Sequence, residues 1–207
     1  YDDVEEVPAA ERDMIAHIPF DEKKYMEAIG VKALKGEKGY STLERNSCRP
    51  SFDVCGIWGG YTGEGSKTVL PSKAYAKVSC RLVPHQQHEK ISRMFVDYIE
   101  SIAPDYVQVK VTPMHGGEGY VCPITLPAYK AAEEGFTKAF GRKPLAVRRG
   151  GSIPIISDFE KILGTKTVLM GFGLESNAIH SPNENFPLDM FRKGIEAVVE
   201  FHESMTL

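Results

Sequence analysis

The sequence has no long hydrophobic run and no strong excess of one charge sign. Its longest apolar stretches, such as residues 167–170, fall far short of the ~20 residues that a membrane-spanning helix needs. The formal net charge of -3 is small for 207 residues, and the lysines and arginines are scattered along the chain. We therefore expect no membrane partner and no nucleic-acid partner.

Cysteine is also scarce, and the first residues carry no targeting signal. Four cysteines occur without a Cys-x-x-Cys pair, which argues against a disulfide scaffold and favours a reduced, cytoplasmic setting. Residues 1–6 are acidic and contain neither the basic nor the hydrophobic region of a signal peptide. Because the chain opens without methionine, we expect it to be an interior part of a longer polypeptide.

The composition is that of an ordinary soluble protein, with 42% hydrophobic and 26% charged residues. A chain of this length can bury one or two cores. Apolar residues at helical spacing, together with alternating stretches, predict an α/β fold. The expected helices are residues 9–17, 21–29, 87–102, 127–140 and 187–202, with another beginning near residue 152, and the expected strands are residues 51–58, 73–83, 106–111 and 166–170.

Two polar residues stand where an anion could bind. Residues 73–83 alternate as a half-buried strand, so Arg81 projects from the face opposite the apolar stripe. It is either a carboxylate clamp or half of a surface ion pair. Ser152 follows two glycines at the start of a predicted helix, where free N–H groups suit a carboxylate; the alternative is an ordinary N-cap serine.

Two of the six histidines lie where ligands commonly bind. His180 lies in a loop that follows the predicted strand 166–170, at the carboxyl end of that strand. His115 precedes two glycines, which let the backbone turn sharply. Its imidazole is either exposed for substrate contact or simply part of a turn. The other four histidines are interpreted as solvated or core residues.

Five segments together resemble the carnosinase and cytosolic non-specific dipeptidase branch of the aminoacylase/carboxypeptidase metallopeptidases, clan MH. Their order and spacing are similar to that branch from about residue 40 to the end. The segments are residues 68–71 (Thr-Val-Leu-Pro), 81–84 (Arg-Leu-Val-Pro), 115–117 (His-Gly-Gly), 150–154 (Gly-Gly-Ser-Ile-Pro) and 180–184 (His-Ser-Pro-Asn-Glu).

This resemblance implies a catalytic α/β domain that binds two divalent metal ions, zinc or manganese, and is interrupted by a lid domain through which two subunits pair. Residues 1–120 would be the lid, a small antiparallel sheet with helices. Residues 125–207 would be the last part of the catalytic zinc-peptidase domain. The implied reaction is hydrolysis of dipeptides with a free carboxyl terminus by a metal-bridged water, in a homodimer.

The resemblance also implies a role for individual residues. His180 resembles the family's final metal ligand. Arg81 resembles the arginine that holds the terminal carboxylate of the substrate, with Ser152 assisting. Thr68 matches a lid threonine that reaches the partner subunit's active site, and His115 matches a lid histidine near the substrate.

Two departures from the family pattern concern the metal site and its surroundings. The family's other metal ligands and its general base belong to an amino-terminal half that has no counterpart in this chain. Because a catalytic zinc uses three protein ligands, the isolated chain is expected to hold no metal tightly and to be inactive. Arg149 stands where relatives usually have Glu, and it either alters specificity near the carboxylate pocket or faces solvent.

Three other functions stay open from the sequence. The first is a dimerisation and scaffold module without activity. The second is an amidohydrolase of N-acyl amino acids, which uses the same clan chemistry with a different acyl pocket. The third is a non-enzymatic α/β domain that binds a small molecule.

Overall fold

The computed structural model describes residues 1–149 and 153–206, and the chain divides into two compact units. Unit 1 consists of Tyr1–Tyr120 and Arg148–Pro154, and unit 2 consists of Val121–Val147 and Ile155–Leu207. No helix in the described part of the chain is long and apolar enough to cross a membrane. The assignment of a lid and a catalytic domain stays a prediction.

Unit 1 begins with three short helices, α1 (Ala9–Ala16), α2 (Glu22–Ile29) and α3 (Thr42–Ser47). α2 starts where the Asp21 carboxylate accepts hydrogen bonds from two backbone N–H groups of its first turn. It ends at Gly30, whose φ of 70° suits glycine. A small core joins α1 to the end of α3: it consists of Val7, Ile15 and Cys48, with Ile18, Tyr40 and Leu43 packed against it.

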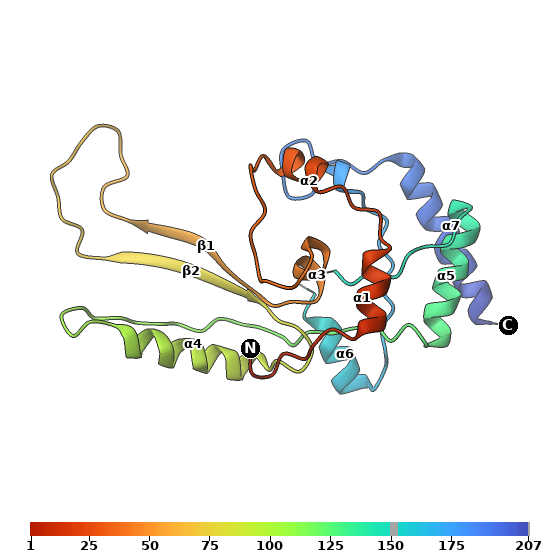
Figure 1. The fold of residues 1–207 in the computed structure, drawn as a ribbon, viewed down its shortest axis with the longest axis horizontal. Helices are drawn as coiled ribbons and strands as arrows, with labels where there is room; N and C mark the ends of the chain where they lie inside the picture. Colours follow the sequence, from red (N-terminus) through yellow and green to blue (C-terminus); the bar gives the residue numbers. More distant parts are fainter. Residues whose placement is uncertain (150–152, 207) are drawn as a thin grey trace. The chain divides into compact units, whose positions relative to one another are not determined.

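A long β-hairpin follows, formed by β1 (Ser51–Gly59) and β2 (Ala74–Arg81) (Figure 1). The strands pair antiparallel, so that Ser51 lies opposite Arg81 at the base of the hairpin. Residues 60–73 form the loop at its tip. Most side chains of both strands are exposed. The described residues supply no further strand to this sheet.

One helix packs against the base of this hairpin. It is α4 (His88–Ile102), which follows β2. The rings of Phe52 on β1 and Phe95 on α4 lie with their centroids 5.8 Å apart. Residues 107–120 then return along the unit without regular secondary structure.

Unit 2 is built around two long helices, α5 (Pro127–Phe140) and α7 (Leu188–Met205), which pack side by side (Figure 1). They approach closely because α5 carries Gly135 at the contact, where a Cβ would lie 2.5 Å from the carbonyl oxygen of Ala197. Ala197 is itself fully buried. Within the described residues, the remaining regular structure of the unit is α6 (Ile155–Leu163) and the 3-10 helix η1 (Glu175–Asn177).

The mixed α/β class, with a small antiparallel sheet and helices, is confirmed. The long helices and the two hairpin strands lie where the sequence patterns predict them. The predicted strands at residues 106–111 and 166–170 are wrong. Neither segment has a hydrogen-bonded strand neighbour among the described residues, and alternation stabilises a strand only when a neighbour completes its ladder.

Candidate functional site

Three of the five motif segments meet in unit 1. A Cβ placed on Gly117 would lie 2.7 Å from the Cβ of Pro154, so the two segments are in direct contact. A Cβ placed on Gly119 would lie 2.8 Å from the carbonyl carbon of Val83. Any larger residue at these two positions would force the neighbouring segment to move. We call this meeting point, made of residues 81–84, 115–119 and 154, the glycine junction.

A buried glutamine organises the turn that follows Arg81. Gln86 is 4% exposed, and its side-chain carbonyl accepts a hydrogen bond of 3.0 Å from the backbone N–H of Val83. The backbone N–H of Gln86 donates in return to the Val83 carbonyl at 3.3 Å. Between them, His85 has a φ of 72°, and its Nε2 lies 3.4 Å from the Glu5 carboxylate. The direction in which the chain leaves β2 is therefore well defined.

Arg81 itself ends β2 with an exposed side chain, and its guanidinium has no ion-pair partner in the described part of the chain. In contrast, Arg12, Arg49 and Arg148 each pair with a glutamate. An unpaired guanidinium presents a planar fork of N–H donors that matches a carboxylate. The alternative role of Arg81 is one half of a surface ion pair. The described residues contain no acidic partner for that pair.

His115 lies in a segment of the same junction. Its side chain is exposed. The next residue, Gly116, lies against the first residue of α4, because a Cβ there would come within 3.1 Å of the His88 ring. The structure therefore brings together the segments that carry Arg81 and His115.

Thr68 lies at the other end of the hairpin, exposed in the tip loop. β2 alone spans about 23 Å from Ala74 to Arg81, at ~3.3 Å per residue. Figure 1 shows the tip loop extending beyond the strands. Within one chain, the structure does not bring Thr68 to Arg81.

His180 lies in unit 2, on the loop between η1 and α7, with an exposed side chain. Its φ is 61°, and two neighbours, Ala178 and Asn183, also have positive φ values of 52° and 65°. Non-glycine residues seldom adopt this conformation, and such strain gathers at functional sites. The loop is therefore built for a specific backbone path around His180.

Of the predicted metal site, this chain carries one candidate ligand, His180. No group of three or more His, Cys, Asp or Glu side chains within residues 1–149 and 153–206 is placed to hold a metal ion. The exposed imidazole of His180 fits the contribution of a single ligand, and the described residues do not form a complete site. Ser152, predicted to assist the carboxylate clamp, lies outside the described residues.

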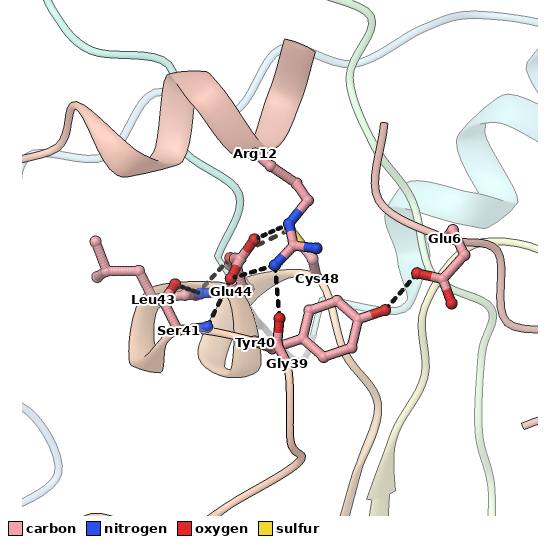
Figure 2. Close-up of polar contacts among 9 residues, drawn as sticks. Glu6, Arg12, Gly39, Tyr40, Ser41, Leu43, Glu44 and Cys48 are labelled. Atoms are coloured by element: carbon pink, nitrogen blue, oxygen red, sulfur yellow. Dashed lines mark hydrogen bonds and ion pairs between the residues drawn. The ribbon is translucent and has the colours of Figure 1, made fainter. Parts of the chain in front are cut away.

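Figure 2 shows a polar cluster in unit 1 that the sequence analysis does not single out. The Glu44 carboxylate accepts hydrogen bonds of 2.6 Å from Arg12 Nε and from the backbone N–H of Ser41. Burial alone would raise the pKa of Glu44, but these bonds outweigh it, and the pKa lies below its ordinary value. The Tyr40 hydroxyl donates to the Glu6 carboxylate at 2.5 Å. The Ser-x-x-Glu spacing of a capping box is the sequence signal that could have located this cluster.

Two further ion pairs tie unit 1 together. Arg49 donates to both carboxylate oxygens of Glu37, at 2.7 and 2.8 Å, and this contact lowers the pKa of Glu37. Arg148 donates to Glu11 of α1 at 2.6 Å. That bond attaches Arg148 to α1, although more than a hundred residues separate the two in the sequence.

The comparison with protein families gives the class of this protein. The model of peptidase family M20/M25/M40 matches residues 5–204. The chain belongs to this peptidase family.

Individual relatives are similar along nearly the whole chain. Cys-Gly metallodipeptidase dug1 of Schizosaccharomyces pombe is 28% identical over 198 residues, which cover 94% of this chain and 42% of that protein. Beta-Ala-His dipeptidase of Homo sapiens is 26% identical over 210 residues, covering 99% of this chain and 41% of that protein.

Solved structures show the same relationship. An M20 family metallo-carboxypeptidase from Sulfolobus solfataricus superposes with a TM-score of 0.85 at 28% identity, covering 97% of this chain and 46% of that chain. Human carnosine dipeptidase 1 superposes with a TM-score of 0.83 at 26% identity, covering 99% and 44%. This chain therefore spans less than half the length of the relatives it matches.

Proposed function

We propose that this chain is part of a metal-dependent dipeptidase that hydrolyses dipeptides with a free carboxyl terminus. The observation that carries the proposal is membership of the M20/M25/M40 peptidase family, whose similar members include a Cys-Gly metallodipeptidase and a Beta-Ala-His dipeptidase. The activity is proposed for the intact enzyme, by which we mean this chain together with a counterpart of the remaining length of these relatives.

In the intact enzyme, residues 1–120 are the lid and residues 125–207 are the last part of the catalytic domain. Two divalent ions, zinc or manganese, would supply an activated water and polarise the scissile carbonyl. This chain contributes one ligand, the exposed imidazole of His180. The family resemblance assigns the general base and the other ligands to the counterpart, since a catalytic zinc needs three protein ligands.

Arg81 is the proposed clamp for the terminal carboxylate of the substrate. Its exposed guanidinium has no ion-pair partner among the described residues and leaves β2 where Gln86 holds the following turn. A charged, bidentate contact would fix the orientation of a short substrate and place its amide bond reproducibly. His115, from the neighbouring segment, and Ser152 are proposed to contact the same substrate.

Thr68 is proposed to act on the active site of a second subunit. It lies about 23 Å or more along the hairpin from Arg81, far beyond the length of a dipeptide. A homodimer that pairs through the lid would allow the tip loop of one subunit to reach the other. The exposed hairpin supplies the surface for that pairing.

The exposed area of the chain supports such partners. The accessible surface is 15941 Å² for a mass of 23.0 kDa. A compact monomer of this mass exposes about 9,600 Å², and two separate domains of the sizes of unit 1 and unit 2 would expose about 11,500 Å². The excess is what a chain shows when surfaces that belong against the counterpart in the intact enzyme, or against a second subunit, are open.

The decisive experiment substitutes Arg81 in the intact enzyme and compares substrates with and without a free terminal carboxylate. Wild type, R81A, R81K and the exposed-arginine control R93A are assayed on a dipeptide and on its carboxamide. Losing a bidentate charged contact of about 2.7 kcal/mol should lower kcat/KM of R81A for the dipeptide about 100-fold and leave the carboxamide almost unchanged. R81K should recover part of the loss. A variant R81A that still prefers the free carboxylate as strongly as wild type would exclude the clamp.

The same assay separates the alternatives. The similarity to a metallo-carboxypeptidase favours longer peptides as a second candidate substrate class, so the substrate panel includes tripeptides and N-acyl amino acids. The preferred substrate among the three classes decides between dipeptidase, carboxypeptidase and N-acyl amino acid amidohydrolase. An intact dimer that turns over none of them would support the scaffold alternative.

A further inference from the structure

The loop that carries His180 is closed at its base by two asparagines. The backbone N–H of Asn185 donates to the carbonyl oxygen of Asn177 at 3.0 Å, and Nδ2 of Asn177 donates to Oδ1 of Asn185 at 3.4 Å. Oδ1 of Asn177 accepts a hydrogen bond of 2.6 Å from the backbone N–H of Leu174. One side-chain amide therefore joins the start of η1 to the far end of the loop.

Asn177 is buried to an unusual degree for a polar residue. Its side chain is 2% exposed, whereas amides are mostly found at protein surfaces. A buried amide is costly unless it is hydrogen-bonded, and a satisfied one selects a single local geometry. An apolar residue of the same size would leave the Leu174 N–H and the Asn185 amide without this partner.

The conformation that this amide holds is strained. Ala178, His180 and Asn183 all have positive φ values, and a non-glycine residue in this region costs of order 1 kcal/mol. Inside the loop, the backbone N–H of Ser181 donates to the Ala178 carbonyl at 3.0 Å and that of Glu184 donates to the Ser181 carbonyl at 3.3 Å, so two local turns are closed. Among the described residues, only the contacts at the base join the two ends of the loop, and Asn177 takes part in each of them.

We propose that Asn177 is a positioning residue for His180: its buried amide holds residues 178–184 in the strained path that presents the imidazole outward. Asn177 does not touch the substrate. The proposal rests on the proposed function in one respect, namely that the presented imidazole serves as a metal ligand. The ordering of the loop by Asn177 is a property of this chain and can be measured separately.

The test compares wild type with N177L, N177D and N185A in the intact enzyme, with N46L as the matched control. Asn46 is an exposed asparagine of α3. Hydrogen–deuterium exchange of a peptide covering residues 174–185 reports on the loop, and metal content per chain after dialysis reports on the imidazole. N177L should exchange at least 10-fold faster in this peptide and lose bound metal. N177D keeps the acceptor for the Leu174 N–H but loses the donor to Asn185 and buries a charge, so it should restore only part of either signal.

The outcomes separate this proposal from the proposed function. Unchanged exchange in a folded N177L overturns the positioning role. If N177L does not fold, N185A decides, because its exposed site is tolerant: a local acceleration confined to residues 174–185 supports the role, and none overturns it. Acceleration in N177L without any loss of metal also overturns it. A wild type that binds no metal contradicts the proposed function, while the exchange rates still decide whether Asn177 orders the loop.

Discussion

The amino-terminal cluster of α1 and α3 and the β1–β2 hairpin lie in the same unit, but they differ in how far their side chains are buried and hydrogen-bonded within the chain. In the cluster, Glu44 is 4% exposed and fully hydrogen-bonded, and a small core is closed beside it. In the hairpin, Ile57 is 80% exposed, and Leu70 in the tip loop is 95% exposed. The cluster is complete within the chain, whereas the hairpin presents apolar side chains and open strand edges that call for a partner.

The largest effect is expected from a substitution in the hairpin that weakens association. If the proposed homodimer pairs through the hairpin, Ile57→Asp should raise its dissociation constant at least about 100-fold, because a carboxylate buried in an apolar interface loses its hydration. Sedimentation velocity over a concentration series measures it. The control is Ile29→Asp, an exposed apolar residue of α2 in the cluster region, which should leave association unchanged. Equal weakening by both variants would contradict the assignment of pairing to the hairpin.

A smaller effect is expected on the cluster side. Glu44→Ala removes the acceptor of Arg12 and of the Ser41 N–H, so the free energy of unfolding should fall by about 2 kcal/mol. Urea denaturation followed by circular dichroism gives the value. Glu27→Ala, an exposed glutamate of α2, should change it by less than about 0.5 kcal/mol. If both substitutions cost the same, the polar cluster is not a stabilising feature.

The smallest effect is a pH dependence confined to the cluster. The pKa values of Glu44 and Glu37 are lowered in the folded state by Arg12, Ser41 and Arg49. A lowered folded pKa gives stability that is fully present above the unfolded value of about 4.3 and is lost as the pH falls through the folded pKa. Thermal unfolding between pH 7 and pH 3 should therefore show a fall below about pH 4. Glu44→Ala should flatten this fall, and an equally steep profile in that variant would contradict the assignment.

The helices could be predicted because their signals are local. Asp21 and Gly30 mark the two ends of α2, and the apolar spacing of α4 and α7 sets their length. The predicted strands at residues 106–111, from alternation, and 166–170, from an apolar run, are wrong. Whether an alternating segment becomes a strand depends on a neighbour elsewhere in the chain, which a local pattern does not contain.

The candidate site likewise has one part that the sequence predicts and another that only the tertiary structure shows. Arg81, His115, Ser152 and His180 are candidates from their local sequence pattern, the family resemblance adds Thr68 and assigns the roles, and those roles stay predictions. The contacts of Gly117 and Gly119, by contrast, depend on segments more than thirty residues away. Asn177 carried no signal in the sequence, because an asparagine near a loop is most often exposed and only the packing of unit 2 buries it.

The sequence by itself determined the family pattern, the helices other than α3 and η1, and the hairpin strands. Each of these depends on residues close together in the chain, whose hydrogen bonds and caps are made within the element or with its immediate neighbour. The tertiary structure alone decided the meeting of three motif segments at the glycine junction, the absence of an ion-pair partner for Arg81 among the described residues, and the burial of Asn177 beneath His180's loop. These features depend on contacts between distant segments, and such contacts form only when the packed chain brings those segments to the same place.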